Sequence, residues 1–191
     1  MNTTNTNITS RSLLSTKSLV ITGMMTALLC VLAQITIPVQ PIPFTLSLFA
    51  IFLIGALLKP RYAFLAVFTY LLLGAFGVPV FAGMKGGLYN LTGKTGGYLA
   101  AYPIMALIVS LSYYYGKKIK ILALSLGMLT ALVVCYTIGT LWFSYVANVD
   151  FYYALTLCVF PFVLFDLLKI VLAVSFSTAI RKLLGKELNE M

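Results

Sequence analysis

Asp166 and Lys169 are the side chains of this sequence best suited to chemistry, because they are a carboxylate and an amine deep within a long apolar segment. Their spacing of three residues places them on one face of a helix, where they can pair. A charge at membrane depth costs about 2.5 to 3.5 kcal/mol on insertion scales, so a span keeps one when it is neutralised, near water or useful to a ligand. The pair therefore predicts either a structural lock between helices or, as we favour, a binding site reached from the outer side.

A glycine-rich segment at about residues 78–97 is the second candidate. It holds six of the chain's 14 glycines, and clustered glycine lets the backbone approach a ligand closely. Because the segment leads into a predicted helix, the free N–H groups at that helix's start would favour an anionic group such as a carboxylate. A flexible external linker is the alternative. The candidate binding residues here are Gly86, Gly87, Asn90, Lys94, Gly96, Gly97 and Tyr98.

The tripeptide Gly93-Lys94-Thr95 does not form a nucleotide-binding phosphate loop. In the pattern G-x-x-x-x-G-K-[ST], the first glycine would fall on Leu88, and no strand is expected before it. If the protein moves a solute with ATP, another subunit must hydrolyse the nucleotide.

Two further features lie around the first apolar segment. Gln34, near its outer end, and Gln40, in the turn that follows, are amides that could hydrogen-bond a solute, although single amides at an interface more often bond water or backbone. Gly23 and Ala27 form a small-xxx-small face that permits close helix packing, either internally or against another subunit.

The composition identifies the elements that must position these residues. The chain has 191 residues, of which 61% are hydrophobic and 9% charged, which excludes an ordinary soluble domain. Three prolines between residues 38 and 43 divide a long uncharged run into two helices. We expect an all-α integral membrane protein with six transmembrane helices, at about 19–37, 45–58, 62–77, 98–115, 121–146 and 152–184. Residues 1–10 are expected to be a disordered polar leader, and 11–191 a single membrane domain with an extracellular glycine-rich loop at about 78–97.

Basic residues provide an independent check on this topology. Six spans place ten lysines and arginines on one side and only Lys85 and Lys94 on the other, a bias that predicts cytoplasmic N- and C-termini in a multi-pass protein of the cell membrane. Topology therefore explains the net charge of +9, and no nucleic-acid partner is expected. The chain has no histidine, and its three cysteines lack paired spacing, so we expect neither a metal site nor a cofactor.

Taken together, several motifs resemble the BioY family, the biotin-binding S components of energy-coupling factor (ECF) transporters. The motifs that carry the resemblance are, in order, Gly23-Met24-Met25-Thr26-Ala27, Ala33-Gln34-Ile35, Pro43-Phe44-Thr45-Leu46, Tyr70-Leu71-Leu72-Leu73-Gly74, Gly77-Val78-Pro79-Val80-Phe81-Ala82-Gly83, Thr95-Gly96-Gly97-Tyr98 and Asp166-Leu167-Leu168-Lys169. They cover nearly the whole chain after the leader. The chain departs from many members in having Lys94 where they have proline.

The resemblance implies a six-helix subunit, not an enzyme, that captures biotin at the extracellular side. Its implied partners, besides membrane lipid, are a transmembrane coupling (T) subunit, contacted through the Gly23 and Ala27 face, and two cytoplasmic ATPases. Asp166 and Lys169 match the family's ligand-contacting pair. On this basis we expect the ureido group of biotin at Asp166 and Asn90. Lys169 would either orient the side chain of Asp166 or donate a hydrogen bond to the carbonyl of the ureido ring.

The biotin carboxylate is then expected at Gly96 and Gly97, with Lys94 adding charge, although the opposite orientation, with Lys169 on the carboxylate, stays open. Three other functions also stay open. They are an S component for another vitamin, a purely structural membrane subunit, and a membrane enzyme that uses Asp166 and Lys169 as acid and base.

Overall fold

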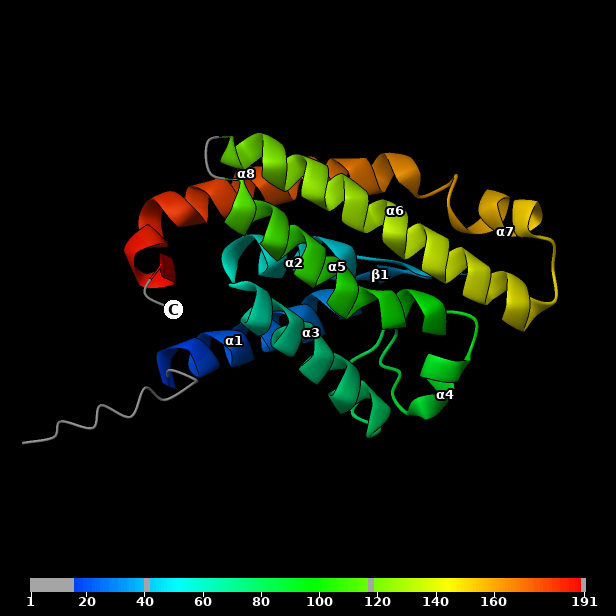
Figure 1. Ribbon diagram of the computed structural model, residues 1–191. Helices are drawn as coiled ribbons and strands as arrows, with labels where there is room; N and C mark the ends of the chain where they lie inside the picture. Colours follow the sequence, from blue (N-terminus) through cyan, green and yellow to red (C-terminus); the bar gives the residue numbers. More distant parts are fainter. Residues whose placement is uncertain (1–15, 40–41, 117–118, 190–191) are drawn as a thin grey trace, which may run out of the picture.

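The computed structural model describes residues 16–39, 42–116 and 119–189, so the predicted leader at 1–10 lies outside the described residues. Over these ranges the chain is mostly helical, as predicted, with one pair of very short strands (Figure 1). The elements are α1 (Thr16–Gln34), β1 (Thr36–Ile37), β2 (Phe44–Thr45), α2 (Ser47–Leu57), α3 (Pro60–Ala75), α4 (Leu88–Thr92), α5 (Gly96–Tyr115), α6 (Lys120–Ala147), α7 (Phe151–Cys158) and α8 (Val163–Asn189).

The prediction of one continuous helix over 152–184 is wrong. The structure has two helices, α7 and α8, separated by a turn over residues 159–162. Pro161 lies in this turn, and proline has no N–H to donate to a helical hydrogen bond. Asp150 begins α7, where its Oδ2 accepts a hydrogen bond of 2.9 Å from the backbone N–H of Tyr152. As a result, Asp166 lies in the first turn of α8 instead of the middle of a long helix.

Both segments expected to be irregular contain regular structure. The proline-containing turn after α1 forms an antiparallel pair of two-residue strands, in which Thr36 lies opposite Thr45, so α1 ends at Gln34 instead of residue 37. The glycine-rich segment contains the short helix α4. Helix α5 begins at Gly96, two residues before the predicted start, so Gly96 and Gly97 belong to its first turn.

Helix α2 forms the centre of the molecule, and nine of its 11 residues are buried. At 1.5 Å per residue it is about 16 Å long, roughly half the thickness of a bilayer core. The extended strand β2 continues the chain beyond its start. Non-helical backbone at membrane depth is tolerated where it is enclosed by protein or lines a cavity. Both conditions hold here, since Thr45 is buried and lines the cavity described below.

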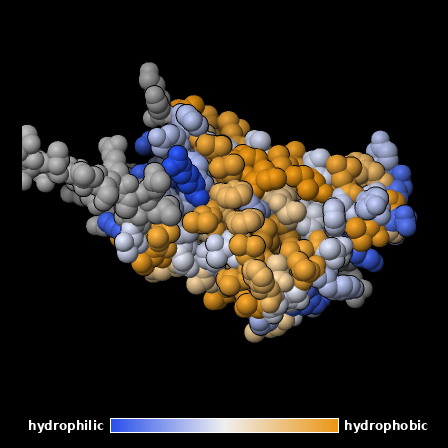
Figure 2. Space-filling view, turned by 60° about the horizontal axis from the view of Figure 1, so that its bottom comes forward, coloured by the Kyte–Doolittle hydropathy of each residue, from blue (hydrophilic) through white to orange (hydrophobic). Residues whose placement is uncertain are grey.

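Four of the described helices, α1, α5, α6 and α8, are long and apolar enough to cross a membrane. Helices α2 and α3 are apolar but shorter, with 11 and 16 residues. Figure 2 shows a broad hydrophobic surface over the middle of the face in view, with hydrophilic surface gathered toward the ends. The chain is thus a multi-pass membrane protein, while the count of six spans stays a prediction.

Most of the described cations gather at one end of the helices. The start of α1, the α2–α3 junction, the start of α6 and the end of α8 lie together at this end (Figure 1). The cations near these points are Lys17, Lys59, Arg61, Lys120, Arg181 and Lys182. Lys85 and Lys94 lie toward the opposite end, with α4 and the α6–α7 turn. The spatial separation agrees with the charge bias along the sequence.

Candidate ligand-binding site

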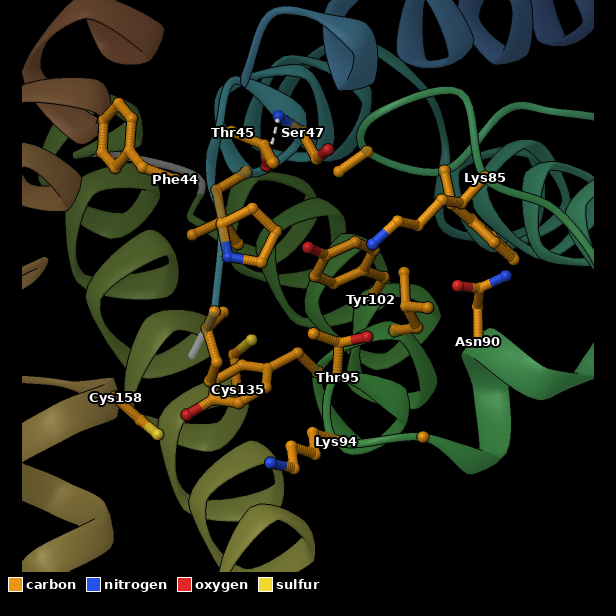
Figure 3. Close-up of a pocket in the computed structure, with 18 of the residues that line it drawn as sticks. Phe44, Thr45, Ser47, Lys85, Asn90, Lys94, Thr95, Tyr102, Cys135 and Cys158 are labelled. Atoms are coloured by element: carbon orange, nitrogen blue, oxygen red, sulfur yellow. Dashed lines mark hydrogen bonds between the residues drawn. The ribbon is translucent and has the colours of Figure 1, made fainter. Parts of the chain in front are cut away.

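A cavity of about 530 Å³ lies between the helices toward the end that carries the glycine-rich segment. Its wall is formed by residues of α5, α6 and α8, of strand β2 and the start of α2, of the ends of α3 and α7, and of the glycine-rich segment (Figure 3). Five of the residues predicted to bind a ligand line it: Asn90, Lys94, Tyr98, Asp166 and Lys169. Segments far apart in the sequence therefore meet around one space, of a size typical for small-molecule sites.

The predicted pairing of Asp166 with Lys169 is confirmed. Lys169 Nζ lies 2.8 Å from Asp166 Oδ1, and the two residues are only 4% and 2% exposed. Single charges buried to this extent would be strongly unfavourable, so each is retained because the other neutralises it.

Three further groups complete the surroundings of this pair. The Tyr136 hydroxyl donates a hydrogen bond of 2.5 Å to Asp166 Oδ2, and Lys169 Nζ donates one of 2.7 Å to the carbonyl oxygen of Thr45. Lys169 Nζ also lies 3.8 Å from the centre of the Phe44 ring, a cation–π contact. A carboxylate has about four lone-pair sites, so Asp166 can accept further hydrogen bonds from a ligand.

Sequence reasoning missed Tyr136, Phe44 and Thr45 as site residues. A signal existed for Phe44 and Thr45, because they follow the proline-containing turn within a motif that carried the family resemblance. Tyr136 is one of 12 tyrosines in an apolar chain, and its side chain is singled out only by the packing of α6 against α8.

The outer part of the cavity carries a different charge pattern. Lys85 and Lys94 line it with exposed side chains, and in Figure 3 the amino group of Lys85 points into the space. Asn90 donates from Nδ2 to the carbonyl oxygen of Gly86 at 2.7 Å, which leaves its Oδ1 available as an acceptor. The cavity therefore has a neutralised ion pair in its buried part and two exposed cations near its outer edge.

Aromatic side chains make up much of the wall between these two regions. Tyr98 is buried, and its hydroxyl lies 3.2 Å from Thr140 Oγ1. The Tyr70 and Phe81 rings pack edge to face with centres 5.6 Å apart. Tyr102 also lines the cavity (Figure 3). Such a lining suits the apolar body of a small ligand.

Gly96 and Gly97 are not among the residues that line the cavity. A Cβ on Gly96 would overlap the backbone carbonyl of Leu91, and one on Gly97 would overlap the side chain of Trp142. The N–H of Gly96 is also engaged, since it donates to the carbonyl oxygen of Gly93 at 3.0 Å. These glycines let α5 pack closely against α4 and α6.

Gly86 and Gly87 also lie outside the cavity lining. A Cβ on Gly86 would meet the backbone of Gly77 and Val78, and Gly87 adopts a φ of 94°, which favours glycine. The Gly87 N–H donates to the carbonyl oxygen of Gly74 at the end of α3. Both glycines thus fix the path by which the chain leads into α4 and places Asn90.

Gln34 does not line the cavity either. Its Nε2 donates to the carbonyl oxygen of Val80 at 2.9 Å, and its Oε1 accepts from the N–H of Met84 at 3.0 Å. The amide thereby fastens the end of α1 to the glycine-rich segment. Gln40 lies outside the described residues.

Gly23 and Ala27 are both exposed on α1, and a Cβ built on Gly23 meets no atom within 4 Å. The buried residues of this helix form the opposite face: Ser18, Thr22, Thr26, Leu29 and Ala33. Of the two uses left open for the small-residue face, the structure excludes internal packing within the described chain. The face points outward.

Comparison with known proteins gives consistent matches. A family model described as the BioY family matches residues 3–186. The biotin transporter BioY of Thermotoga maritima is 39% identical over 87% of this chain and 97% of its own length. A probable biotin transporter BioY of Pyrococcus horikoshii is 38% identical over 83% of this chain and 92% of its own length.

A solved structure is also similar to this chain. It is the crystal structure of the S-component for biotin from an ECF-type ABC transporter. The two folds superpose with a TM-score of 0.82, at 26% sequence identity, over 87% of this chain and 91% of that one.

Proposed function

The chain belongs to the BioY family, and from that premise we propose that it is the biotin-binding specificity subunit of an ECF-type vitamin uptake transporter. The family consists of transporter components and not of enzymes. The observation that carries the proposal is the buried pair of Asp166 and Lys169, which faces a cavity of small-molecule size.

The ureido group of biotin suits the buried part of the cavity. This group offers two N–H donors and one carbonyl acceptor on a rigid ring. Asp166 retains acceptor capacity for an N–H of the ring, whereas the free Oδ1 of Asn90, which the sequence suggested as a second acceptor, lies in the outer part of the cavity. Lys169 holds Asp166 in place and serves as the donor beside the ring carbonyl. The aromatic wall would cover the thioether ring.

The carboxylate of biotin belongs, in this proposal, near Lys85 and Lys94. Both cations are exposed at the outer part of the cavity, whereas the N–H of Gly96 is already engaged within the chain. This arrangement keeps the valerate chain pointing outward. The four glycines at 86, 87, 96 and 97 then act indirectly, by fixing the loop and helices that carry Asn90, Lys94 and Tyr98.

We further propose that residues 11–191 form one membrane domain of six spans in the plasma membrane, with both termini cytoplasmic. The gathering of described cations at one end of the helices supports this orientation. The cavity would then open to the extracellular side. Transport would depend on a transmembrane coupling subunit and two cytoplasmic ATPases, which supply the nucleotide site that this sequence lacks.

The outward face of α1 is the proposed contact with the coupling subunit. Gly23 and Ala27 make it smooth enough for another helix to approach closely. Ala27→Trp should therefore reduce copurification of the coupling subunit while leaving biotin affinity unchanged. Loss of biotin binding to the same degree would contradict a docking role.

The test of biotin binding is calorimetric titration of detergent-purified protein from which copurified ligand has been removed. Saturable, tight binding of biotin, with no heat from thiamin or riboflavin, is the expected result. Tight binding of another vitamin would assign the subunit to that vitamin. No binding by folded protein would leave the buried pair as a structural lock and refute the proposal.

A further inference from the structure

A second cavity, of about 240 Å³, lies at the end of the helices opposite the glycine-rich segment. It lies between the last turns of α5, the first turns of α6 and the C-terminal part of α8. The residues that line it are Tyr113, Lys120, Ile121, Leu124, Ser177, Thr178, Arg181 and Lys182. Three of these are cations, and none of these described residues is acidic.

Arg181 is fixed in this cavity by neutral partners. Its Nε donates to the carbonyl oxygen of Ala56 at 2.9 Å and its Nη2 to that of Leu57 at 3.2 Å, at the C-terminal end of α2. The guanidinium carbon lies 3.8 Å from the centre of the Tyr113 ring. No acid among the described residues forms a salt bridge with it. The Nε and Nη2 donors of Arg181 are therefore taken by α2. What the side chain offers a phosphate is its Nη1 group and a charge that is held in one orientation and is not neutralised by an acid of the described residues.

Lys120 and Lys182 add two exposed cations to the cavity. Beside them, the first turn of α6 and the end of α8 present apolar side chains to the outside: Ile121 is 58% exposed, Leu122 53% and Leu184 52%. A free phosphate would contact only the cations. A molecule with a phosphate and long apolar chains would contact both the cations and this apolar surface.

We propose that this cavity binds the phosphate headgroup of an anionic phospholipid, with the acyl chains lying along the apolar surface of α6 and α8. Basic pockets between the ends of membrane helices bind such headgroups in other proteins. The site is separate from the biotin cavity and does not rest on biotin being the transported solute. It would fix a lipid where α2, α5, α6 and α8 meet.

The experiment measures lipid binding to the purified full-length protein by native mass spectrometry, with dioleoylphosphatidylglycerol and, for comparison, dioleoylphosphatidylcholine. The test variant is Lys120→Gln with Lys182→Gln, which removes two exposed charges and leaves the Arg181 contact with α2 intact. The matched control is Lys59→Gln with Arg61→Gln, which removes two charges from the same end but outside the cavity. Melting temperatures of both variants verify the fold.

We expect wild-type protein to retain phosphatidylglycerol in preference to phosphatidylcholine. The test variant should bind phosphatidylglycerol about 30-fold more weakly, whereas the control should stay close to wild type. Equal losses in both variants would show that general surface charge is responsible, and would overturn the proposal. Equal binding of the two lipids would overturn it as well. Displacement of the lipid by millimolar inorganic phosphate would assign the cavity to free phosphate instead.

Discussion

Asp166→Asn is the substitution that separates a binding role of the buried pair from a structural one. Asparagine keeps the size of the side chain but removes its negative charge. Lys169 would then remain 4% exposed without a carboxylate beside it, and its charge would face only neutral groups: the amide oxygen of the new side chain, the Thr45 carbonyl and the Phe44 ring. Breaking a buried ion pair by removing one member typically costs about 3 to 5 kcal/mol. At about 2 to 4 °C per kcal/mol for a chain of this length, the melting temperature should fall by about 10 °C.

The same substitution should also weaken biotin binding, for a reason separate from the loss of stability. The substitution replaces a charged acceptor by a neutral amide, and a hydrogen bond to a charged group contributes about 1.5 to 3 kcal/mol. This corresponds to a loss of affinity of roughly 10- to 150-fold, since 1.4 kcal/mol is a factor of ten. Calorimetry measures the affinity, and scanning fluorimetry in detergent measures the melting temperature.

The double variant Asp166→Asn with Lys169→Met distinguishes the two effects. It leaves no unpaired charge, so the melting temperature should recover toward the wild-type value. Biotin affinity should stay low, because the ligand has lost its acceptor. Recovery of both properties in the double variant would show that the pair only locks α8 into the bundle. A single variant that melts and binds like wild type would refute the reasoning altogether.

Three further variants test the site and the packing beside it. Tyr136→Phe removes a hydrogen bond of 2.5 Å to the buried carboxylate and should weaken biotin binding by about tenfold in calorimetry; unchanged affinity would contradict its positioning role. Lys85→Gln with Lys94→Gln should weaken binding of biotin but not of its neutral methyl ester, and equal weakening of both would favour the opposite ligand orientation. Gly97→Ala places a Cβ against the tryptophan of α6 and should lower stability by about 1 to 3 kcal/mol in thermal melting, whereas Gly23→Ala, at an open position, should not.

The sequence predicts the membrane-spanning class and most helix positions, because an apolar run of about 20 residues is typical of a membrane-spanning helix. It did not predict the break at Pro161, since the apolar run continues through it and hydropathy alone does not detect a turn. It also did not predict α4, whose five residues are held by contacts with α5 and by the bond from Trp142 Nε1 to the Gly93 carbonyl. Such contacts depend on tertiary packing.

The residues of the candidate site also fall into those that the sequence predicts and those that it does not. Asp166 and Lys169 stand out in the sequence because charge is rare in an apolar segment, and their pairing follows from helical spacing. The glycines also stand out, but their composition does not distinguish a backbone that contacts a ligand from one that packs against Trp142. Tyr136 and Thr45 reach the ion pair only because α6 and β2 pack beside α8.

The two depths at which charge occurs in the cavity have a kinetic consequence. Lys85 and Lys94 are exposed, so their attraction for an approaching anion is screened by salt over about 8 Å at physiological ionic strength. The buried ion pair is shielded from solvent ions and is affected far less. Ionic strength should therefore change how fast an anionic solute enters the cavity more than how long it stays, since only the contact of its carboxylate with the two exposed lysines is screened. A carrier built in this way would capture its solute more slowly at high than at low ionic strength, with a smaller change in the residence time of the solute.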